Sequence, residues 1–178
     1  SPLDLAPEMT FEVGSITKQF TAISILMLME QGKLKLTDDI TMYLPNYPTQ
    51  GQKITIHHLL THTSGIKNYT SLKAIRKVAT QALSPQEVID LFKEEEMDFK
   101  PGERFKYNNS GYIILGYIIE QLSGQAYGEF VKQNIFDPLE MTSSMYGLPT
   151  EKEQDPSVAK GYSKRKDNYK DAREISFT

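Results

Sequence analysis

The sequence lacks three features, each of which would point to a particular class of protein. It contains no cysteine, which excludes disulfide bonds and thiol catalysis. It has no excess of basic residues: the formal net charge is −3 and the isoelectric point about 5.7, so nothing marks a nucleic-acid-binding surface. Its longest apolar run, residues 22–29, is far shorter than the roughly 20 residues that a membrane-spanning helix needs. The remaining composition, with 39% hydrophobic and 24% charged residues in 178, is that of one ordinary globular domain.

A serine and a lysine three residues apart stand at the head of that apolar segment. We predict a helix from about Ser15 to Gln31, which places Ser15 and Lys18 one turn apart on one face. Gly14 allows the chain to turn sharply just before the serine. A serine hydroxyl is a poor nucleophile unless a neighbouring base activates it, and a lysine can be that base once burial or another cation removes its charge. Because apolar residues cover nearly every side of the segment, we expect a core helix. The alternative is that Ser15 only caps the helix.

A tyrosine and an asparagine two residues apart form the second chemical candidate. Tyr107-Asn108-Asn109 reads as an extended segment, in which residues 107 and 109 project to the same side. Above a serine nucleophile, the tyrosine oxygen can pass a proton to the leaving group, and the Asn109 amide can hold both a substrate carbonyl and the lysine. The alternative is a turn rich in Asn and Ser that caps the following helix.

The histidines give a weaker signal. His58 and His62 are four residues apart, which suits a shared zinc ion, but no glutamate completes the His-Glu-x-x-His pattern. We therefore expect no metal site and interpret both histidines as capping and packing residues. His62 and Ser64 are two residues apart and would not face each other on a helix, so no serine–histidine pair is expected.

Cap residues and breaks predict further short elements, most of them helical. We expect a helical turn at 37–44, a helix from the Thr55 cap to about 62, a weak helix at 71–82, a helix from the Ser84 cap to about 95, and helices over about 110–122 and 127–135. Residues 147–178 are polar, with strands expected around 159–162 and 173–177. The chain would thus divide into a helical lobe over about 10–146 and a β or irregular tail.

Four motifs, in this order, resemble the serine β-lactamase-related family. They are FEVGSITKQFTA at 11–22, LLTHTSGI at 59–66, YNNSGY at 107–112 and NIFDPLEM at 134–141. The family includes class C β-lactamases, penicillin-binding D-alanyl-D-alanine carboxypeptidases, D-aminopeptidases and family-VIII-type esterases. The resemblance covers about residues 9–162 and implies an α+β β-lactamase/transpeptidase-like fold.

The resemblance implies a role for each matching residue. Ser15 would be the acyl-accepting nucleophile, Lys18 its proton partner, Tyr107 a proton shuttle and Asn109 a substrate-binding residue. A β-lactam, a D-amino-acid peptide or a small ester would acylate Ser15, and water would then release the acyl group. The backbone N–H of Ser15 would be one oxyanion-hole donor. The order of proton transfers between Lys18 and Tyr107 stays open. No cofactor or metal is implied, and the expected partner is a small-molecule or peptide substrate.

The sequence also departs from the family pattern. The family has a third motif, Lys-Thr-Gly or His-x-Gly, on a strand of the central sheet, and neither form occurs here. The strands that precede the nucleophile helix are missing as well. We therefore expect the helical lobe of a longer protein, with the central antiparallel sheet largely missing, an incomplete site and exposed apolar faces that favour self-association. The alternative is a non-catalytic binding or structural protein that keeps the fold. Cell-wall or β-lactam substrates would imply export, whereas esterase members can be intracellular.

Overall fold

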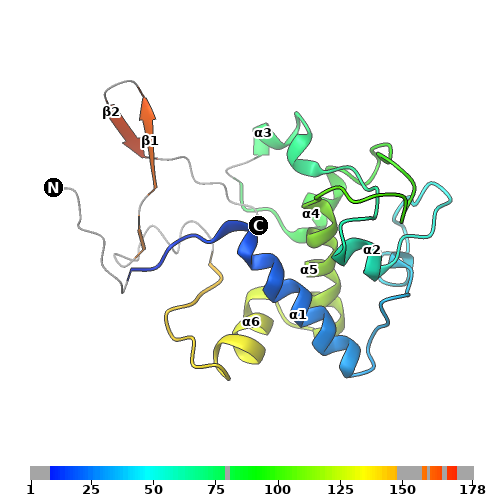
Figure 1. Ribbon diagram of the computed structural model, residues 1–178, viewed down its shortest axis with the longest axis horizontal. Coiled ribbons are helices and arrows are strands. Elements are labelled where there is room, and N and C mark those ends of the chain that lie inside the picture. Colours follow the sequence, from blue (N-terminus) through cyan, green and yellow to red (C-terminus); the bar gives the residue numbers. More distant parts are fainter. Residues whose placement is uncertain (1–8, 79–80, 148–157, 160, 166–167, 172–178) are drawn as a thin grey trace.

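The computed structural model of the chain is mostly helical, with one small β-hairpin to one side of the helices (Figure 1). It describes residues 9–78, 81–147, 158–159, 161–165 and 168–171. The α-helices are α1 (Thr17–Glu30), α2 (Ile56–Leu60), α3 (Ile75–Val78), α4 (Pro85–Asp90), α5 (Ser110–Ser123) and α6 (Tyr127–Val131). The shorter turns are the 3-10 helices η1 (Gly14–Ile16), η2 (Ile40–Met42) and η3 (Tyr69–Ser71) and the π-helical turn η4 (Lys132–Phe136). The hairpin pairs β1 (Tyr162–Arg165) with β2 (Asn168–Asp171) in antiparallel register.

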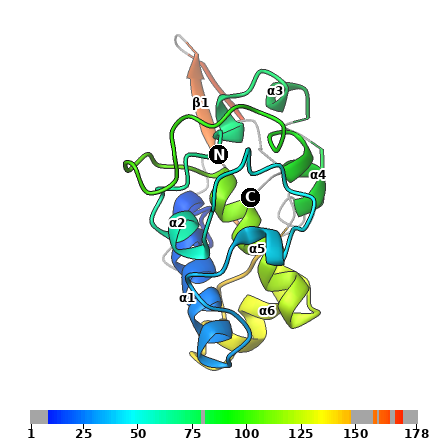
Figure 2. The ribbon, with the colours of Figure 1, turned by 90° about the vertical axis from the view of Figure 1, so that its right-hand side faces the viewer.

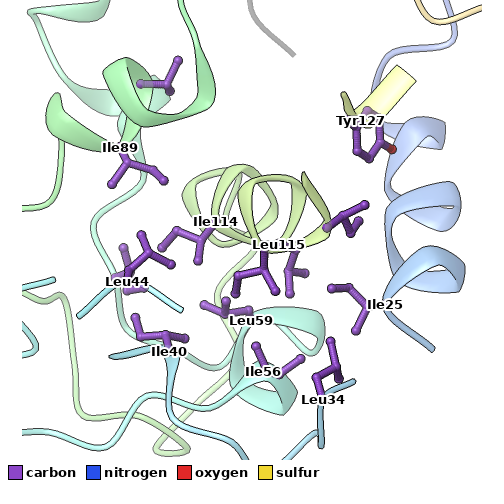
Figure 3. Packing of buried hydrophobic residues seen from close by; sticks show 14 of the residues in the cluster. Ile25, Leu34, Ile40, Leu44, Ile56, Leu59, Ile89, Ile114, Leu115 and Tyr127 are labelled. Atoms are coloured by element: carbon purple, nitrogen blue, oxygen red, sulfur yellow. The ribbon is translucent and has the colours of Figure 1, made fainter. Parts of the chain in front are cut away.

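Helix α5 is the centre of the lobe. Helices α1, α2, α4 and α6 all contact it (Figures 1 and 2). Its side chains Ile114, Leu115, Ile118 and Ile119 are fully buried, as the 3.6-residue period of the sequence predicts. In the core, residues of α5 meet Leu59 of α2 and residues of α1 (Figure 3). The N-terminal end of α5, which follows the Tyr107–Asn109 segment, is therefore held by core packing on several sides.

The starts predicted at the Thr55 and Ser84 caps are confirmed, whereas the helices predicted from Ser15 and from 71 begin later, at Thr17 and Ile75, and some predicted ends are wrong. Thr55 and Ser84 cap α2 and α4, each in a capping box. Helix α4 ends at Asp90 and not near residue 95, because backbone N–H groups at 91 and 92 bond to the third carbonyl back and tighten the chain into turns. Helix α6 ends at Val131, where the chain widens into η4. Of the weak helix expected at 71–82, the described residues contain only α3.

The first long helix is buried on one side only, so the prediction of a core helix is wrong for the described residues. Ile25 and Leu28 are fully buried, whereas Ile23 is 48% exposed and Leu26 36% exposed. An apolar face open to solvent on this helix is what we expected of a lobe without its central sheet. Self-association through that face stays a prediction.

The hairpin lies near one of the two strands expected in the tail. Strand β1 begins at Tyr162, where the strand predicted at 159–162 was expected to end, and the one predicted at 173–177 lies outside the described residues. A boundary near residue 146 stays a prediction. Within the described part of the chain, no helix combines the length and the hydropathy of a membrane span.

Candidate active site

Ser15 lies in η1, the tight turn immediately before α1. Gly14 has a φ of 50°, a left-handed conformation that suits glycine and turns the chain just ahead of the serine. The serine thus sits in a 3-10 turn and not in the α-helix that we predicted, but its spacing from Lys18 is preserved. The Lys18 ammonium nitrogen Nζ donates a hydrogen bond to Ser15 Oγ at 3.2 Å. The predicted serine–lysine pair is therefore formed, with the serine exposed and the lysine half-buried.

The Tyr107–Asn109 segment lies over this pair from the other half of the chain. Tyr107 Oη donates a hydrogen bond to Ser15 Oγ at 2.6 Å, although the two residues are 92 positions apart. Asn109 Oδ1 accepts a hydrogen bond from Lys18 Nζ at 2.8 Å. Residues 107 and 109 thus project to the same side, as an extended segment predicts. The structure brings all four predicted site residues into one hydrogen-bonded group.

The surroundings of Lys18 and Tyr107 suit opposite charges. Lys18 Nζ lies 5.0 Å from the centre of the Tyr107 ring and 5.5 Å from that of Tyr112, distances at which an ammonium interacts favourably with an aromatic face. Burial raises the pKa of the Tyr107 hydroxyl, but hydrogen bonding to Lys18 and Ser15, together with the positive charge of Lys18, outweighs burial and lowers that pKa overall. Ser15 Oγ therefore contacts an unusually acidic phenol at short range.

Two buried residues alternate with the two site residues and fix the segment. The Asn108 side chain is 4% exposed; its Nδ2 donates to the Ile66 carbonyl, and its Oδ1 accepts from the Gly111 N–H at 2.9 Å. Ser110 Oγ is likewise buried, donating to the Lys67 carbonyl at 2.6 Å. Inward-facing polar side chains at 108 and 110 thus hold 107 and 109 in place above Ser15.

The loop around η3 borders Asn109. The Asn109 N–H donates to Asn68 Oδ1 at 3.2 Å, and its Nδ2 lies 3.4 Å from Thr70 Oγ1. Both partners belong to the stretch around η3, beyond the Gly65 turn. Gly65 has a φ of 75°, and a Cβ there would overlap the carbonyl oxygen of Phe99. This close approach seats the loop beside the site, and no local motif around Asn68 or Thr70 predicts their place there.

The histidines lie where a capping and packing interpretation puts them. His58 Nδ1 accepts the Thr55 N–H at 3.3 Å and completes the α2 capping box. The His62 ring packs against that of Tyr107, with 4.6 Å between their centres. Ser64 is 1% exposed, and its hydroxyl accepts the Ile66 N–H at 3.4 Å. Across the described residues, no group of three or more potential metal ligands comes together.

Comparisons with known proteins agree on one family. Residues 4–175 match the family model described as Beta-lactamase. Penicillin-binding protein 4* of Bacillus subtilis is 36% identical over 155 residues, a match that covers 85% of this chain and 34% of that protein. The chain therefore spans about a third of the length of this curated relative.

Solved structures show the same relationship in three dimensions. The octameric penicillin-binding protein homologue of Pyrococcus abyssi superimposes with a TM-score of 0.79 at 37% identity, covering 92% of this chain and 39% of that chain. The D-amino acid amidase of Ochrobactrum anthropi, in complex with D-phenylalanine, gives a TM-score of 0.74 at 28% identity, covering 89% and 44% of the two chains. The helical lobe thus has the fold that the motifs implied.

Proposed function

Because the chain belongs to the beta-lactamase family, we propose that it is the nucleophile-bearing part of a serine acyl hydrolase. The observation that carries the proposal is the position of Ser15 Oγ, 2.6 Å from Tyr107 Oη and 3.2 Å from Lys18 Nζ. An activated nucleophile requires a base in hydrogen-bond reach that is itself oriented by a third group. Tyr107 becomes that base when its phenol is ionised, and Lys18 is the neighbouring group that favours the ionised form.

In the proposed reaction, Ser15 Oγ attacks the carbonyl carbon of an amide, a lactam or an ester. The hydroxyl proton passes to the ionised form of Tyr107, which the neighbouring Lys18 favours, and then to the leaving amine or alcohol. A water molecule later attacks the ester formed on Ser15 and restores the free serine. The shorter distance to Tyr107 and its lowered pKa support Tyr107 over Lys18 as the first proton acceptor.

Lys18 and Asn109 have supporting roles in this scheme. Lys18 remains an ammonium that stabilises the tyrosinate, and the Asn109 carbonyl oxygen holds the lysine at 2.8 Å. The amide nitrogen of Asn109, which faces Thr70 at 3.4 Å, would turn to a substrate carbonyl. The backbone N–H of Ser15 is the proposed oxyanion donor, and losing one such donor typically costs about 100- to 1000-fold in kcat.

We propose that the substrate is a β-lactam, a D-amino-acid amide or peptide, or a small ester. Support for the D-amino-acid class comes from the structural similarity to a D-amino acid amidase that was solved with D-phenylalanine. Support for the β-lactam class comes from the 36% sequence identity to penicillin-binding protein 4*. All of these substrates present a carbonyl whose acyl group can transfer to a serine.

The test is intact-protein mass spectrometry after exposure to benzylpenicillin, to a D-phenylalanine p-nitroanilide and to a p-nitrophenyl ester. We expect a covalent adduct that peptide digestion maps to Ser15, and the reagent that reacts fastest identifies the substrate class. Ser15→Ala should give no adduct and the same thermal melting curve as the unaltered protein. Ser24→Ala, which removes a buried serine from α1, the helix that follows Ser15, is the control and should still form the adduct.

Two outcomes would count against the proposal. An adduct that persists in Ser15→Ala would place the nucleophile elsewhere. A folded full-length protein that forms no adduct with any of the three reagents would favour the alternative of a binding protein that has kept the fold.

A further inference from the structure

His62 contacts the segment that carries Tyr107 at three places. Its carbonyl oxygen accepts the Lys106 N–H at 2.9 Å, and its ring nitrogen Nδ1 accepts the Asn108 N–H at 3.2 Å. Its ring lies against that of Tyr107, with 4.6 Å between the centres and 39° between the planes. The histidine thus holds the backbone on both sides of the tyrosine as well as the tyrosine ring.

The backbone of His62 is itself in an unfavourable conformation. Its φ is 58°, in the left-handed region that few residues other than glycine adopt. Neighbours maintain this conformation: the His62 N–H donates to the Leu59 carbonyl at 3.3 Å, and the Phe105 ring lies perpendicular to the imidazole, with 5.8 Å between the ring centres. A strained residue held by its surroundings, next to a group of reactive side chains, is a reason to look for function.

We propose that His62 is a positioning residue, which sets the ring and the backbone of Tyr107 so that the phenol meets Ser15. The inference rests on the proposed function, because it assigns His62 to the reaction through Tyr107 and gives it no contact with substrate. It also fixes the chemical form of the imidazole. Nδ1 accepts a hydrogen bond, so it carries no proton, and the proton of the neutral ring is on Nε2.

The charged and titratable groups around the imidazole agree with a neutral ring. Lys18 on α1 lies nearby, and the rings of Tyr107 and Tyr112 lie 4.6 Å and 5.1 Å from the imidazole, measured between ring centres. Burial and the positive charge of Lys18 lower the pKa of His62, and the hydrogen bond that Nδ1 accepts from the Asn108 N–H also favours the neutral ring. Protonation of Nδ1 would set two N–H groups against each other and release the Asn108 backbone. The position of Tyr107 should then depend on a group that never touches the substrate.

The first test is a double-mutant cycle on the rate of adduct formation at Ser15. His62→Phe keeps an aromatic ring and removes the Nδ1 acceptor, and His62→Asn keeps a residue that tolerates a left-handed backbone and removes the ring. We expect each to slow the adduct by about 10- to 100-fold, the scale of a misplaced catalytic group. In the Tyr107→Phe variant, the same His62 substitutions should not slow the adduct further, because His62 acts through the Tyr107 hydroxyl, which this variant has already lost. His57→Phe, at an exposed position in α2, is the control and should react like the unaltered protein.

A merely structural role predicts a different pattern. Loss of general stability would slow both backgrounds equally, so additive effects would overturn the inference. Unchanged adduct rates in His62→Phe and His62→Asn would overturn it as well.

A second measurement separates this inference from the proposed function. In ¹⁵N-labelled protein, long-range nitrogen–proton NMR spectra should show His62 with a bare Nδ1 at pH 7.5, and the Asn108 amide signal should move as His62 titrates. A proton on Nδ1 at that pH would overturn the positioning role even if Ser15 reacts. So would an Asn108 amide signal whose chemical shift does not change as His62 titrates. If the unaltered protein forms no adduct, the proposed function fails, and these spectra alone decide whether His62 holds Tyr107.

Discussion

Replacing either of two neighbouring asparagines by alanine is expected to affect a different property: stability in one case and reaction rate in the other. The Asn108 side chain is 4% exposed and bonds to two backbone groups, the Ile66 carbonyl and the Gly111 N–H. Asn109 is half-buried and holds Lys18 through its carbonyl oxygen at 2.8 Å. We therefore predict that Asn108→Ala destabilises the fold, whereas Asn109→Ala leaves the fold stable and slows the reaction.

The size of the stability effect follows from the groups left unpaired. Removing the Asn108 amide strands one buried carbonyl and one buried N–H, and each such group costs about 1–3 kcal/mol. A total of about 3 kcal/mol in the free energy of unfolding would lower Tm by about 6–12 °C, since about 1 kcal/mol shifts Tm by about 2–4 °C in a chain of this size. Asn109→Ala should cost under about 1 kcal/mol, because the groups that it releases can reach water.

Thermal melting followed by circular dichroism measures the first effect, and the rate of adduct formation on Ser15 measures the second. Asn46→Ala, at an exposed position far from the site in sequence, is the control and should change neither. If Asn108→Ala melts like the unaltered protein, its two hydrogen bonds do not hold the segment. If Asn109→Ala loses as much stability as Asn108→Ala, the division between an anchoring and a reacting asparagine is wrong.

Three further predictions test the loop and the ionisable groups. Gly65→Ala should lower the free energy of unfolding by at least about 2 kcal/mol, because a left-handed conformation costs a non-glycine residue about 1–2 kcal/mol and the new Cβ would also overlap neighbouring backbone. Gly32→Ala is the control: Gly32 has a similar φ but open space around it, so the substitution should cost only the conformational part. Equal losses in Tm for the two variants would contradict this reasoning. Burial and nearby positive charge lower the folded-state pKa of both His58 and His62, so the unfolded chain takes up protons first and the free energy of unfolding should fall as pH drops below about 6.5. A pH-independent Tm between pH 7.5 and 5 would show that neither histidine is held neutral. The lowered pKa of Tyr107 predicts that the adduct rate rises with pH and levels off below pH 10, and Tyr107→Phe should lack this rise.

The features that the sequence predicted well are local ones. The Ser15–Lys18 contact depends only on a spacing of three residues in a helical turn, and the caps at Thr55 and Ser84 depend on side chains three residues from their partners. Tyr107 is 92 positions from Ser15, and its contact was predicted only through the resemblance to a family and not through any local rule.

The features that the sequence did not reveal depend on distant neighbours. A hydrophobic pattern shows that a helix is apolar but not what covers it, so the exposed side of α1 at Ile23 and Leu26 could not be read from its composition. Thr70 lies beside Asn109 only because the loop turns at Gly65, and the left-handed backbone of His62 is set by its neighbours. Tertiary contacts decide all of these positions.

The candidate site is a product of the contact between α1 and α5. Ser15 lies two residues before the first helix and Tyr107 three residues before the second, so the relative position of the two helix starts determines the distance between the proposed nucleophile and the proposed base. Lys18 spans the junction, since one nitrogen bonds to Ser15 at 3.2 Å and to Asn109 at 2.8 Å. Further along the same helices, fully buried side chains such as Ile25 and Leu115 pack in the common core. Burial of apolar side chains therefore sets the relative position of the two helices. The polar side chains near the helix starts then need only be long enough to form hydrogen bonds with one another.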